Sequence, residues 1–217
     1  MLFQNREEAA HLLAEKLKKY QGQNPLVLGI PRGAVPMAKI IAETLEGELD
    51  VVLVHKLGAP GNPEFAIGSV SEGGDVFLSD AARAMGISHD RIEREVQAQL
   101  ETLRHRRAMY TPIHPPIDPS NRIVIVVDNG IATGATMIAA LRAVRAKKPA
   151  KLIGAVAVAP PDTVERIAKE TDEVVCLATP LNFFAVGQFF LEFSQVSDEE
   201  VMAILQQARK QSGTPAS

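Results

Sequence analysis

Three apolar segments in the second half of the chain constrain its fold more than any other feature. They are RIVIVVD at 122–128, LIGAVAVA at 152–159 and EVVCLA at 173–178, and helical patterns separate them. Near-continuous apolar strands that alternate with helices are typical of a parallel sheet covered by helices on both faces. Shorter apolar runs at 25–30 and 50–55 continue the alternation toward the N-terminus. We therefore expect an α/β protein with a mostly parallel central sheet.

The remaining segments are predicted to extend this core, because 217 residues suit one domain with an appendage. The single domain, 1–217, is expected to comprise a core at about 22–58 and 120–180, a mobile loop at 57–75, and a helical insertion at about 76–118 and 180–196. The loop prediction rests on frequent glycine and proline, with room for a hairpin. The insertion contains a long helix that starts after Ser88 and stops at Pro112.

Composition and charge exclude several classes of protein. A net charge of −3 gives no support for a nucleic-acid coat or a membrane-surface binder, and no apolar run reaches the length of a membrane span. The N-terminal residues lack a hydrophobic signal segment, which indicates a cytoplasmic protein. Cys176 is the only cysteine, so disulfide frameworks and cysteine-rich zinc sites within one chain are excluded. The five histidines show no metal-ligand spacing.

Two helix starts have a recognisable spacing. Asn5 precedes Glu8 by three residues, and Ser197 precedes Glu200 by three. A short polar residue followed three positions later by glutamate is typical of a capping box, in which each side chain binds the other residue's backbone N–H. We therefore predict helices that begin just after Asn5 and just after Ser197.

The segment from Asp128 to Thr136 carries the clearest chemistry. A buried strand ends in Asp128 and Asn129, and the loop GIATGAT then opens directly into a helix. Small residues allow a close backbone approach, while exposed N–H groups, the helix N-terminus and two threonine hydroxyls attract phosphate. Neither a P-loop nor a dinucleotide-binding glycine pattern is present. A carboxylate just before a phosphate loop suits the hydroxyls of a ribose.

These residues resemble a known family signature. Four apolar residues, then Asp128 and Asn129 at the place of an acidic pair, then ATGAT, are similar to the phosphoribosyl pyrophosphate (PRPP) motif of the type I phosphoribosyltransferases. LGIPRG, which contains Arg32 and Gly33, resembles that family's pyrophosphate loop, and Val54-His-Lys56 resembles the strand end where it carries a basic residue. The resemblance covers nearly the whole chain and extends to a subgroup whose acceptor is unassigned.

The resemblance implies a three-layer fold, with helices on both faces of the sheet and a hood region that covers the acceptor. It implies a pentosyltransferase of nucleotide metabolism that moves ribose 5-phosphate from PRPP to a small nitrogen-containing acceptor, with release of pyrophosphate. Magnesium would be held by the substrate, with no dedicated protein ligand and Asp128 as the one candidate. We expect neither nucleic acid nor a membrane as a partner, and a homodimer remains an open alternative.

Individual roles follow from the same resemblance. The catalytic residues would be Asp128, Asn129 and Lys56. The 5′-phosphate would be bound by Ala132, Thr133, Gly134, Ala135 and Thr136. Pyrophosphate would be bound by Arg32, Gly33 and Lys56, and the acceptor would contact Phe183 and Phe184. Each of these residues also has a structural interpretation without a role in the site. Arg32 could be a surface arginine and Lys56 a solvated lysine, and the phenylalanines could lie in the core or in a subunit contact.

Two departures from the family pattern keep a second function open. Asn129 stands where the family usually has an acid, and an amide brings no negative charge toward a cationic sugar. The segment 57–74 contains Glu64 and Glu72 but neither lysine nor arginine. The alternative is therefore a non-catalytic PRPP- or nucleotide-binding regulator. A hydrolase or nucleotide phosphatase is disfavoured, because the chain has no Gly-x-Ser-x-Gly motif and no catalytic cysteine.

Overall fold

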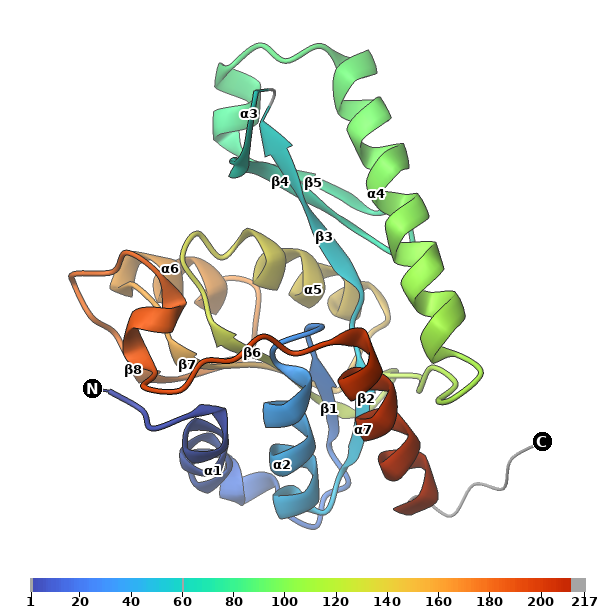
Figure 1. The fold of residues 1–217 in the computed structure, drawn as a ribbon, viewed down its shortest axis with the longest axis vertical. Coiled ribbons are helices and arrows are strands. Elements are labelled where there is room, and N and C mark those ends of the chain that lie inside the picture. Colours follow the sequence, from blue (N-terminus) through green and yellow to red (C-terminus); the bar gives the residue numbers. More distant parts are fainter. Residues whose placement is uncertain (1, 60, 212–217) are drawn as a thin grey trace.

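A five-stranded parallel sheet forms the centre of the molecule (Figure 1). The computed structural model describes residues 2–59 and 61–211. Residues 1, 60 and 212–217 and the side chains of 62–66, 80, 81 and 211 lie outside that description, and Glu64 is among them. The strands, in spatial order, are β2 (Glu48–Val51), β1 (Leu26–Gly29), β6 (Ile123–Gly130), β7 (Lys151–Val158) and β8 (Glu173–Ala178). All four pairings are parallel, which confirms the fold predicted from the apolar strands.

Helices cover both faces of this sheet. Helices α1 (Arg6–Leu17) and α2 (Val35–Leu45) lie on one face, and α5 (Ala135–Ala146) and α6 (Pro161–Ala168) lie on the other (Figure 1). The side chains of β6 alternate accordingly: Ile125 and Val127 belong to the core under α1 and α2, whereas Val124 and Val126 belong to the core under α5. The last helix, α7 (Asp198–Gln211), packs against α2 and β2.

A second sheet stands apart from the first and carries the long insertion helix (Figure 1). It consists of the antiparallel strands β3 (Val54–Ala59), β4 (Asn62–Ser71) and β5 (Val76–Leu78). Helices α3 (Asp80–Ala84) and α4 (His89–Tyr110) follow, and α4 packs against β3 and β4. We call β3, β4, β5, α3 and α4 the hood.

The hood corrects the prediction of a loop at 57–75, because most of that segment is strand. Leu57, Ile67 and Val70 are fully or almost fully buried, and they belong to the same core as the apolar side of α4. The hairpin that the sequence left room for is therefore present. Gly68 reflects a close approach of two strands, because a Cβ there would lie 2.2 Å from the carbonyl oxygen of Phe77.

The apolar run at 50–55 was predicted to be one strand, and this prediction is wrong. The run contains the end of one strand and the start of another. Strand β2 stops at Val51, and β3 begins at Val54 in the other sheet. Between them, the Val52 N–H donates to the Gly29 carbonyl in the core, whereas the Leu53 carbonyl accepts from the Glu72 N–H in the hood. The run is continuously apolar because it is buried first in one sheet and then in the junction.

The N-terminal residues pack against the segment that precedes the last helix. Phe3 pairs with Phe190, and short 3₁₀ turns cover Lys18–Tyr20 and Val186–Phe189. Asn5 caps α1 and Ser197 caps α7, each through a hydrogen bond to the backbone N–H three residues on, as predicted. No helix in residues 2–59 or 61–211 combines the length and the apolar character needed to cross a membrane.

The glycine at 68 provides a test of the hood. We expect Gly68→Ala to destabilise the hood by about 1–3 kcal/mol, because the new methyl group overlaps a backbone oxygen of β5 that cannot move without breaking the pairing. Gly73→Ala is the control, since its Cβ would meet Asp75 and Ser71 only at ordinary contact distances of 3.4 and 3.6 Å. Hydrogen exchange of the β4 and β5 amides measures both; equal exchange in the two variants would contradict the close approach.

Candidate functional site

Two loops lie at the carboxyl edge of the central sheet, one after β1 and one after β6. Because adjacent parallel strands end at the same edge, the loop that contains Arg32 and Gly33 is brought beside the loop that follows Asn129. The edge between two such strands is where open α/β sheets bind their ligands. The sequence motifs at 28–33 and 128–136 therefore converge, although they lie far apart along the chain.

The loop after β6 presents an uncapped helix N-terminus. Gly134 adopts a left-handed conformation, with φ of +75°, and no described side chain caps the first turn of α5. The N–H groups of that turn have no acceptor within the helix, so they remain available to an anion. Ala132 and Thr133 are exposed, while Ala135 and Thr136 in the helix are partly buried. All five residues predicted to bind phosphate thus surround one helix end.

A residue that the sequence analysis missed holds this loop in place. Thr163 of α6 is fully buried, and its hydroxyl donates to the carbonyl of Ala132 over 2.7 Å. Arg166 in turn donates to the Thr163 hydroxyl over 2.8 Å. Nothing in the sequence near residue 163 suggests a link to residue 132, because α6 is brought there only by its packing on the sheet.

Asp128 and Asn129 point to opposite sides of the sheet. Side chains alternate along a strand, so Asp128 continues the row of Val126 toward α5 and Asn129 continues the row of Val127 toward α2. Asn129 is buried, and a Cβ at Gly33 would lie only 2.5 Å from its Nδ2. Its Oδ1 is buried without a hydrogen-bond partner in the described part of the chain. The two residues therefore serve different parts of the site.

The environment of Asp128 disfavours its negative charge. Although part of its surface is accessible, burial of the carboxyl raises its pKa to about 7. Hydrogen bonds from the backbone N–H groups of Asn129 and Gly130 oppose this rise, the first over 2.7 Å to Oδ1. A carboxyl group poised near neutral pH, at the end of a strand beside an anion site, is typical of a functional residue.

Three arginines line a cavity beside the loop after β1. This cavity, which we call the arginine pocket, has a volume of about 500 Å³ and is lined by Arg6, Arg32 and Arg106, with Gly33 and Phe193. The Arg6 guanidinium carbon lies 3.9 Å from the centre of the Phe193 ring. Its Nε is buried without a partner in the described residues. The pocket therefore concentrates positive charge, which favours an anionic ligand.

Only Arg32 of these three arginines was predicted to take part. Arg6 lies at the start of α1 and Arg106 near the end of α4, so neither belongs to a local motif. Pairing of Phe3 with Phe190 brings Arg6 to the pocket, where it donates to the Ser194 carbonyl over 2.7 Å. The available sequence signal was weak: arginines are common on solvated helix faces, as α4 itself illustrates.

Asp198 connects the arginine pocket to two helices. Its Oδ2 lies 3.2 Å from a guanidinium nitrogen of Arg32, and its Oδ1 accepts from the Tyr110 hydroxyl over 2.7 Å. Tyr110 is fully buried at the end of α4. Burial, and to a smaller extent the Asp198 carboxylate, raises the pKa of its hydroxyl. Arg32 is thus oriented by the first turn of α7, which the sequence did not indicate.

Of the other predicted site residues, one lies on the second sheet and two lie in the segment after β8. Lys56 is half-buried on β3 of the hood, opposite Ser69 of β4, and so lies on a different sheet from Asp128. Phe183 packs on Phe189, with ring centres 5.2 Å apart. Phe184 is 89% exposed, so it does not belong to the core.

The residues present fit a magnesium ion only when a substrate supplies most of its ligands. No cluster of three or more His, Cys, Asp or Glu side chains that could hold a metal ion occurs in the described ranges. Asp128 offers a carboxylate and Asn129 an unpaired amide oxygen, both hard ligands of the kind that Mg²⁺ accepts. Bound phosphates and hydroxyls would have to provide the other oxygens.

The raised pKa of Asp128 predicts a pH-dependent cost to stability. The folded carboxyl keeps its proton up to about pH 7, whereas an unfolded one releases it near 3.8, so the free energy of unfolding falls as pH rises between these values. We expect Asp128→Asn to be more stable than the wild type by about 1–3 kcal/mol at pH 8, with the difference vanishing toward pH 4. Thermal melting across this range measures it; a less stable variant at pH 8 would contradict the assignment.

Comparison with known proteins agrees with this geometry. The family described as "Phosphoribosyl transferase domain" matches residues 1–193. Two Mycobacterium tuberculosis proteins, named "Putative phosphoribosyl transferase MT0597" (strain CDC 1551 / Oshkosh) and "Putative phosphoribosyl transferase Rv0571c" (strain H37Rv), are 42% identical over 210 residues, which is 96% of this chain and 47% of each relative. The chain thus spans about half the length of these relatives. The crystal structure of TT1426 from Thermus thermophilus is 46% identical and superposes with a TM-score of 0.83, covering 95% of this chain and 99% of that one. The chain belongs to the phosphoribosyltransferase family.

Proposed function

We propose that this protein transfers the 5-phosphoribosyl group of PRPP to a nitrogen of a small acceptor and releases pyrophosphate. The observation that carries the proposal is the order of groups along the carboxyl edge of the sheet. The uncapped N-terminus of α5 lies on the Asp128 side of β6, and the arginine pocket lies on the Asn129 side. Two anion sites separated by a carboxyl group match a ribose that carries phosphate at one end and pyrophosphate at the other.

The 5′-phosphate would bind at the start of α5. Backbone N–H groups from Ala132 to Thr136, together with the hydroxyls of Thr133 and Thr136, supply the donors, and the helix dipole favours the negative charge. Gly134 allows the sharp turn that points these donors outward, since its φ of +75° suits glycine. The bond from Thr163 to Ala132 keeps the loop in this conformation before the ligand arrives.

The ribose would lie against Asp128. Its hydroxyls donate hydrogen bonds to the carboxylate, which lowers the pKa of a group that burial has raised to about 7. As the bond from the anomeric carbon to pyrophosphate breaks, its electron pair leaves with the pyrophosphate and positive charge develops on the sugar. The Asp128 carboxylate then stabilises a charge that is larger in the transition state than in the bound substrate.

Pyrophosphate would be held by the arginine pocket. Arg32 and the Gly33 backbone approach it from one loop, and Arg6 and Arg106 add two cations from α1 and α4. Magnesium held by the substrate phosphates would supply positive charge beside these arginines. Asp198 fixes the orientation of Arg32, so the guanidinium need not be ordered when the ligand binds. A contribution from Lys56 remains a prediction.

The acceptor would stack on an exposed aromatic side chain. Phe184 is 89% exposed and follows β8 at the same edge of the sheet as the phosphate loop, and Phe183 supports this segment through Phe189. A planar nitrogen heterocycle suits such a surface. The acceptor nitrogen forms the new bond to the anomeric carbon with its lone pair, and the proton that it carried is released.

A PRPP-binding regulator is the second candidate, and Asn129 is the observation that favours it. An amide at this buried position cannot stabilise a cationic sugar as a carboxylate would. Thermal melting with PRPP and magnesium, alone and with a panel of purines, pyrimidines and other heterocycles, identifies ligands through the stability that binding adds. A pyrophosphate-release assay with the acceptors found then separates the enzyme from the regulator.

Arg106 provides a test of the pyrophosphate site. Arg106→Gln should weaken the binding of magnesium pyrophosphate about tenfold, because it removes one of three cations from the pocket while leaving ribose 5-phosphate affinity unchanged. The matched control is Arg104→Gln, which changes an exposed arginine two residues earlier on the same helix. Calorimetric titration of both ligands measures the effect. Equal losses of the two ligands, or equal losses in the two variants, would overturn the assignment.

Asn129→Asp tests whether the amide limits catalysis. The new carboxylate would face the loop that contains Gly33. A Cβ built on Gly33 would lie 2.5 Å from Nδ2 of Asn129 and 3.7 Å from a terminal nitrogen of Arg6, so the Arg6 cation is close enough to offset the added negative charge. We expect pyrophosphate release to rise about tenfold to a hundredfold, with PRPP affinity changed much less. A loss of rate with one acceptor would instead show that the amide is adapted to that acceptor. No turnover by either form, with PRPP binding intact, would favour the regulator.

A further inference from the structure

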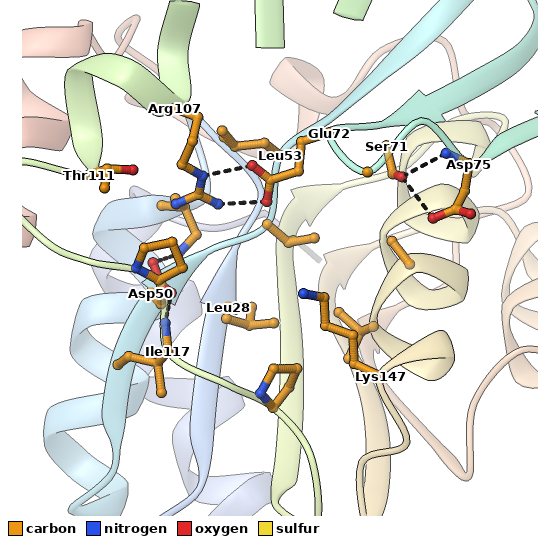
Figure 2. Close-up of a pocket in the computed structure, with 17 residues that line it drawn as sticks. Leu28, Asp50, Leu53, Ser71, Glu72, Asp75, Arg107, Thr111, Ile117 and Lys147 are labelled. Carbon is orange, nitrogen blue, oxygen red and sulfur yellow. Dashed lines mark hydrogen bonds and ion pairs between the residues drawn. The ribbon is translucent and has the colours of Figure 1, made fainter. Parts of the chain in front are cut away.

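A separate cavity lies between the central sheet and the hood, away from the edge that carries the phosphate loop. Its volume is about 370 Å³, within the range of small-molecule sites. Figure 2 shows it below the Arg107–Glu72 pair, with Leu28 of β1 at its base and Lys147 at the end of α5 on one side. No residue of the arginine pocket and none of residues 128–136 lines it.

Both connections between the core and the hood form the walls of this cavity. Val52 and Leu53 contribute from the crossing between β2 and β3, and Thr111, Pro116, Ile117 and Pro119 contribute from the return between α4 and β6. The Glu72 N–H that donates to the Leu53 carbonyl closes the top. A molecule in the cavity would therefore contact every covalent path that joins the two parts.

The interior of the cavity is mainly apolar. Leu28, Val52, Leu53, Ile117 and Val144 line it, and they come from β1, from both connections and from α5. Figure 2 shows the labelled members of this set, Leu28, Leu53 and Ile117, around a common space. Such a surface favours an apolar or aromatic body, because burying it removes apolar area on both partners from water.

The charged groups favour one negative charge on that body. Arg107 holds Glu72 through two hydrogen bonds of 2.7 Å, which cancels the glutamate charge, yet its third nitrogen is buried without a partner in the described residues. Lys147 extends into the cavity (Figure 2) and makes no ion pair within 4 Å with a described residue. The buried Arg107 nitrogen favours an acceptor, because it has none in the described residues. Lys147 is exposed, so water solvates its ammonium, which adds a positive charge beside the cavity.

The acids on the cavity wall are already engaged. Asp50 is 2% exposed and accepts from the backbone N–H groups of Val51 and Ile117, over 2.7 and 2.8 Å. Burial also raises the pKa of its carboxyl. Asp75 lies at the rim and accepts from the Ser71 hydroxyl over 3.2 Å (Figure 2).

One further acid lies near enough to Lys147 to sense its charge. Hydrogen bonds from Ser120, and to a smaller extent the Lys147 ammonium, lower the pKa of the Asp118 carboxyl. Asp118 is exposed, does not line the cavity and accepts from the Ser120 hydroxyl over 2.5 Å. Both side chains are exposed, so water weakens the attraction between them.

We propose that this cavity binds a small aromatic or apolar molecule with one anionic group, and that the ligand holds the hood in its position against the core. The anionic group meets Lys147 and Arg107, and the apolar body contacts the two connections. This site is distinct from the one proposed for the transfer reaction, because the two share no lining residue among the described residues. It gives the protein a means to respond to a second metabolite class.

Three probes of one shape and different charge test the ligand class: 2-naphthoate, 2-naphthalenemethanol and 2-naphthylmethylammonium. In methyl spectra of the full chain, we expect 2-naphthoate to shift Leu28, Leu53 and Val144 saturably, the alcohol to bind about tenfold more weakly, and the ammonium to bind least. Absence of these shifts, or ammonium binding at least as tight as naphthoate binding, would overturn the proposal.

Two variants and a matched control test the position. Lys147→Gln should weaken 2-naphthoate about five- to tenfold, whereas Lys148→Gln should not, because the adjacent lysine is equally exposed but does not line the cavity. Ala143→Leu should exclude all three probes by filling the space one helical turn before Lys147. Equal effects of the two lysine variants, or undiminished binding to Ala143→Leu, would place the ligand elsewhere and overturn the site.

Hydrogen exchange tests the effect on the hood. Saturating 2-naphthoate should slow exchange of the Glu72 amide, which bridges the hood and the core through Leu53, at least about threefold more than it slows exchange within β7. Uniform slowing throughout the chain, or no slowing at Glu72, would overturn the claim that the ligand holds the hood. PRPP added without naphthoate serves as the comparison, so a failure of the transfer proposal would leave these readouts intact.

Discussion

Strand β6 is paired on both edges and buried on both faces, and the positions of the candidate site residues follow from that constraint. Its hydrogen bonds to β1 bring the Arg32 loop beside the phosphate loop. Its side-chain alternation, set by the apolar cores on the two faces, sends Asp128 toward α5 and Asn129 toward α2. A shift of one residue in its register would exchange these two positions and also turn Val126 and Val127 to the wrong cores.

Several groups in the site have unfavourable surroundings in the protein alone. Burial raises the pKa of the Asp128 carboxyl to about 7. Oδ1 of Asn129 and Nε of Arg6 are both buried without a hydrogen-bond partner in the described chain. Each such group costs stability, typically about 1–3 kcal/mol for an unsatisfied buried polar atom. Unmet donors and acceptors that face one edge of a sheet are the ones that a polar ligand can satisfy, which is why stability and function compete at such positions.

The hood and the core are joined covalently at 52–53 and at 111–122, and β3 and β4 also pack on α5, so distant parts of the molecule are coupled. Helix α4 provides Arg106 to the arginine pocket and Arg107, the next residue, to the cavity between the sheets. Tyr110 on the same helix binds Asp198, which orients Arg32. A displacement of α4 would therefore alter both cavities together, so that a ligand of one has a physical route to influence the other.

The sequence by itself determined the parallel sheet, its helices and the two binding loops, because these depend on local patterns: apolar strands, capping residues and a small-residue turn into a helix. It also predicted the anion-binding character of the turn after Asp128, while the roles of the predicted residues remain proposals for which the structure supplies positions. It predicted a loop with room for a hairpin in the glycine-rich segment and did not decide between them, because the requirement at Gly68 comes from a neighbouring strand that local sequence does not reveal. Only the tertiary structure decided that Lys56 belongs to the hood, that Arg6 and Arg106 join Arg32, and that Asp128 and Asn129 face apart. Those outcomes depend on contacts between residues far apart in the chain, whose energies no short pattern encodes.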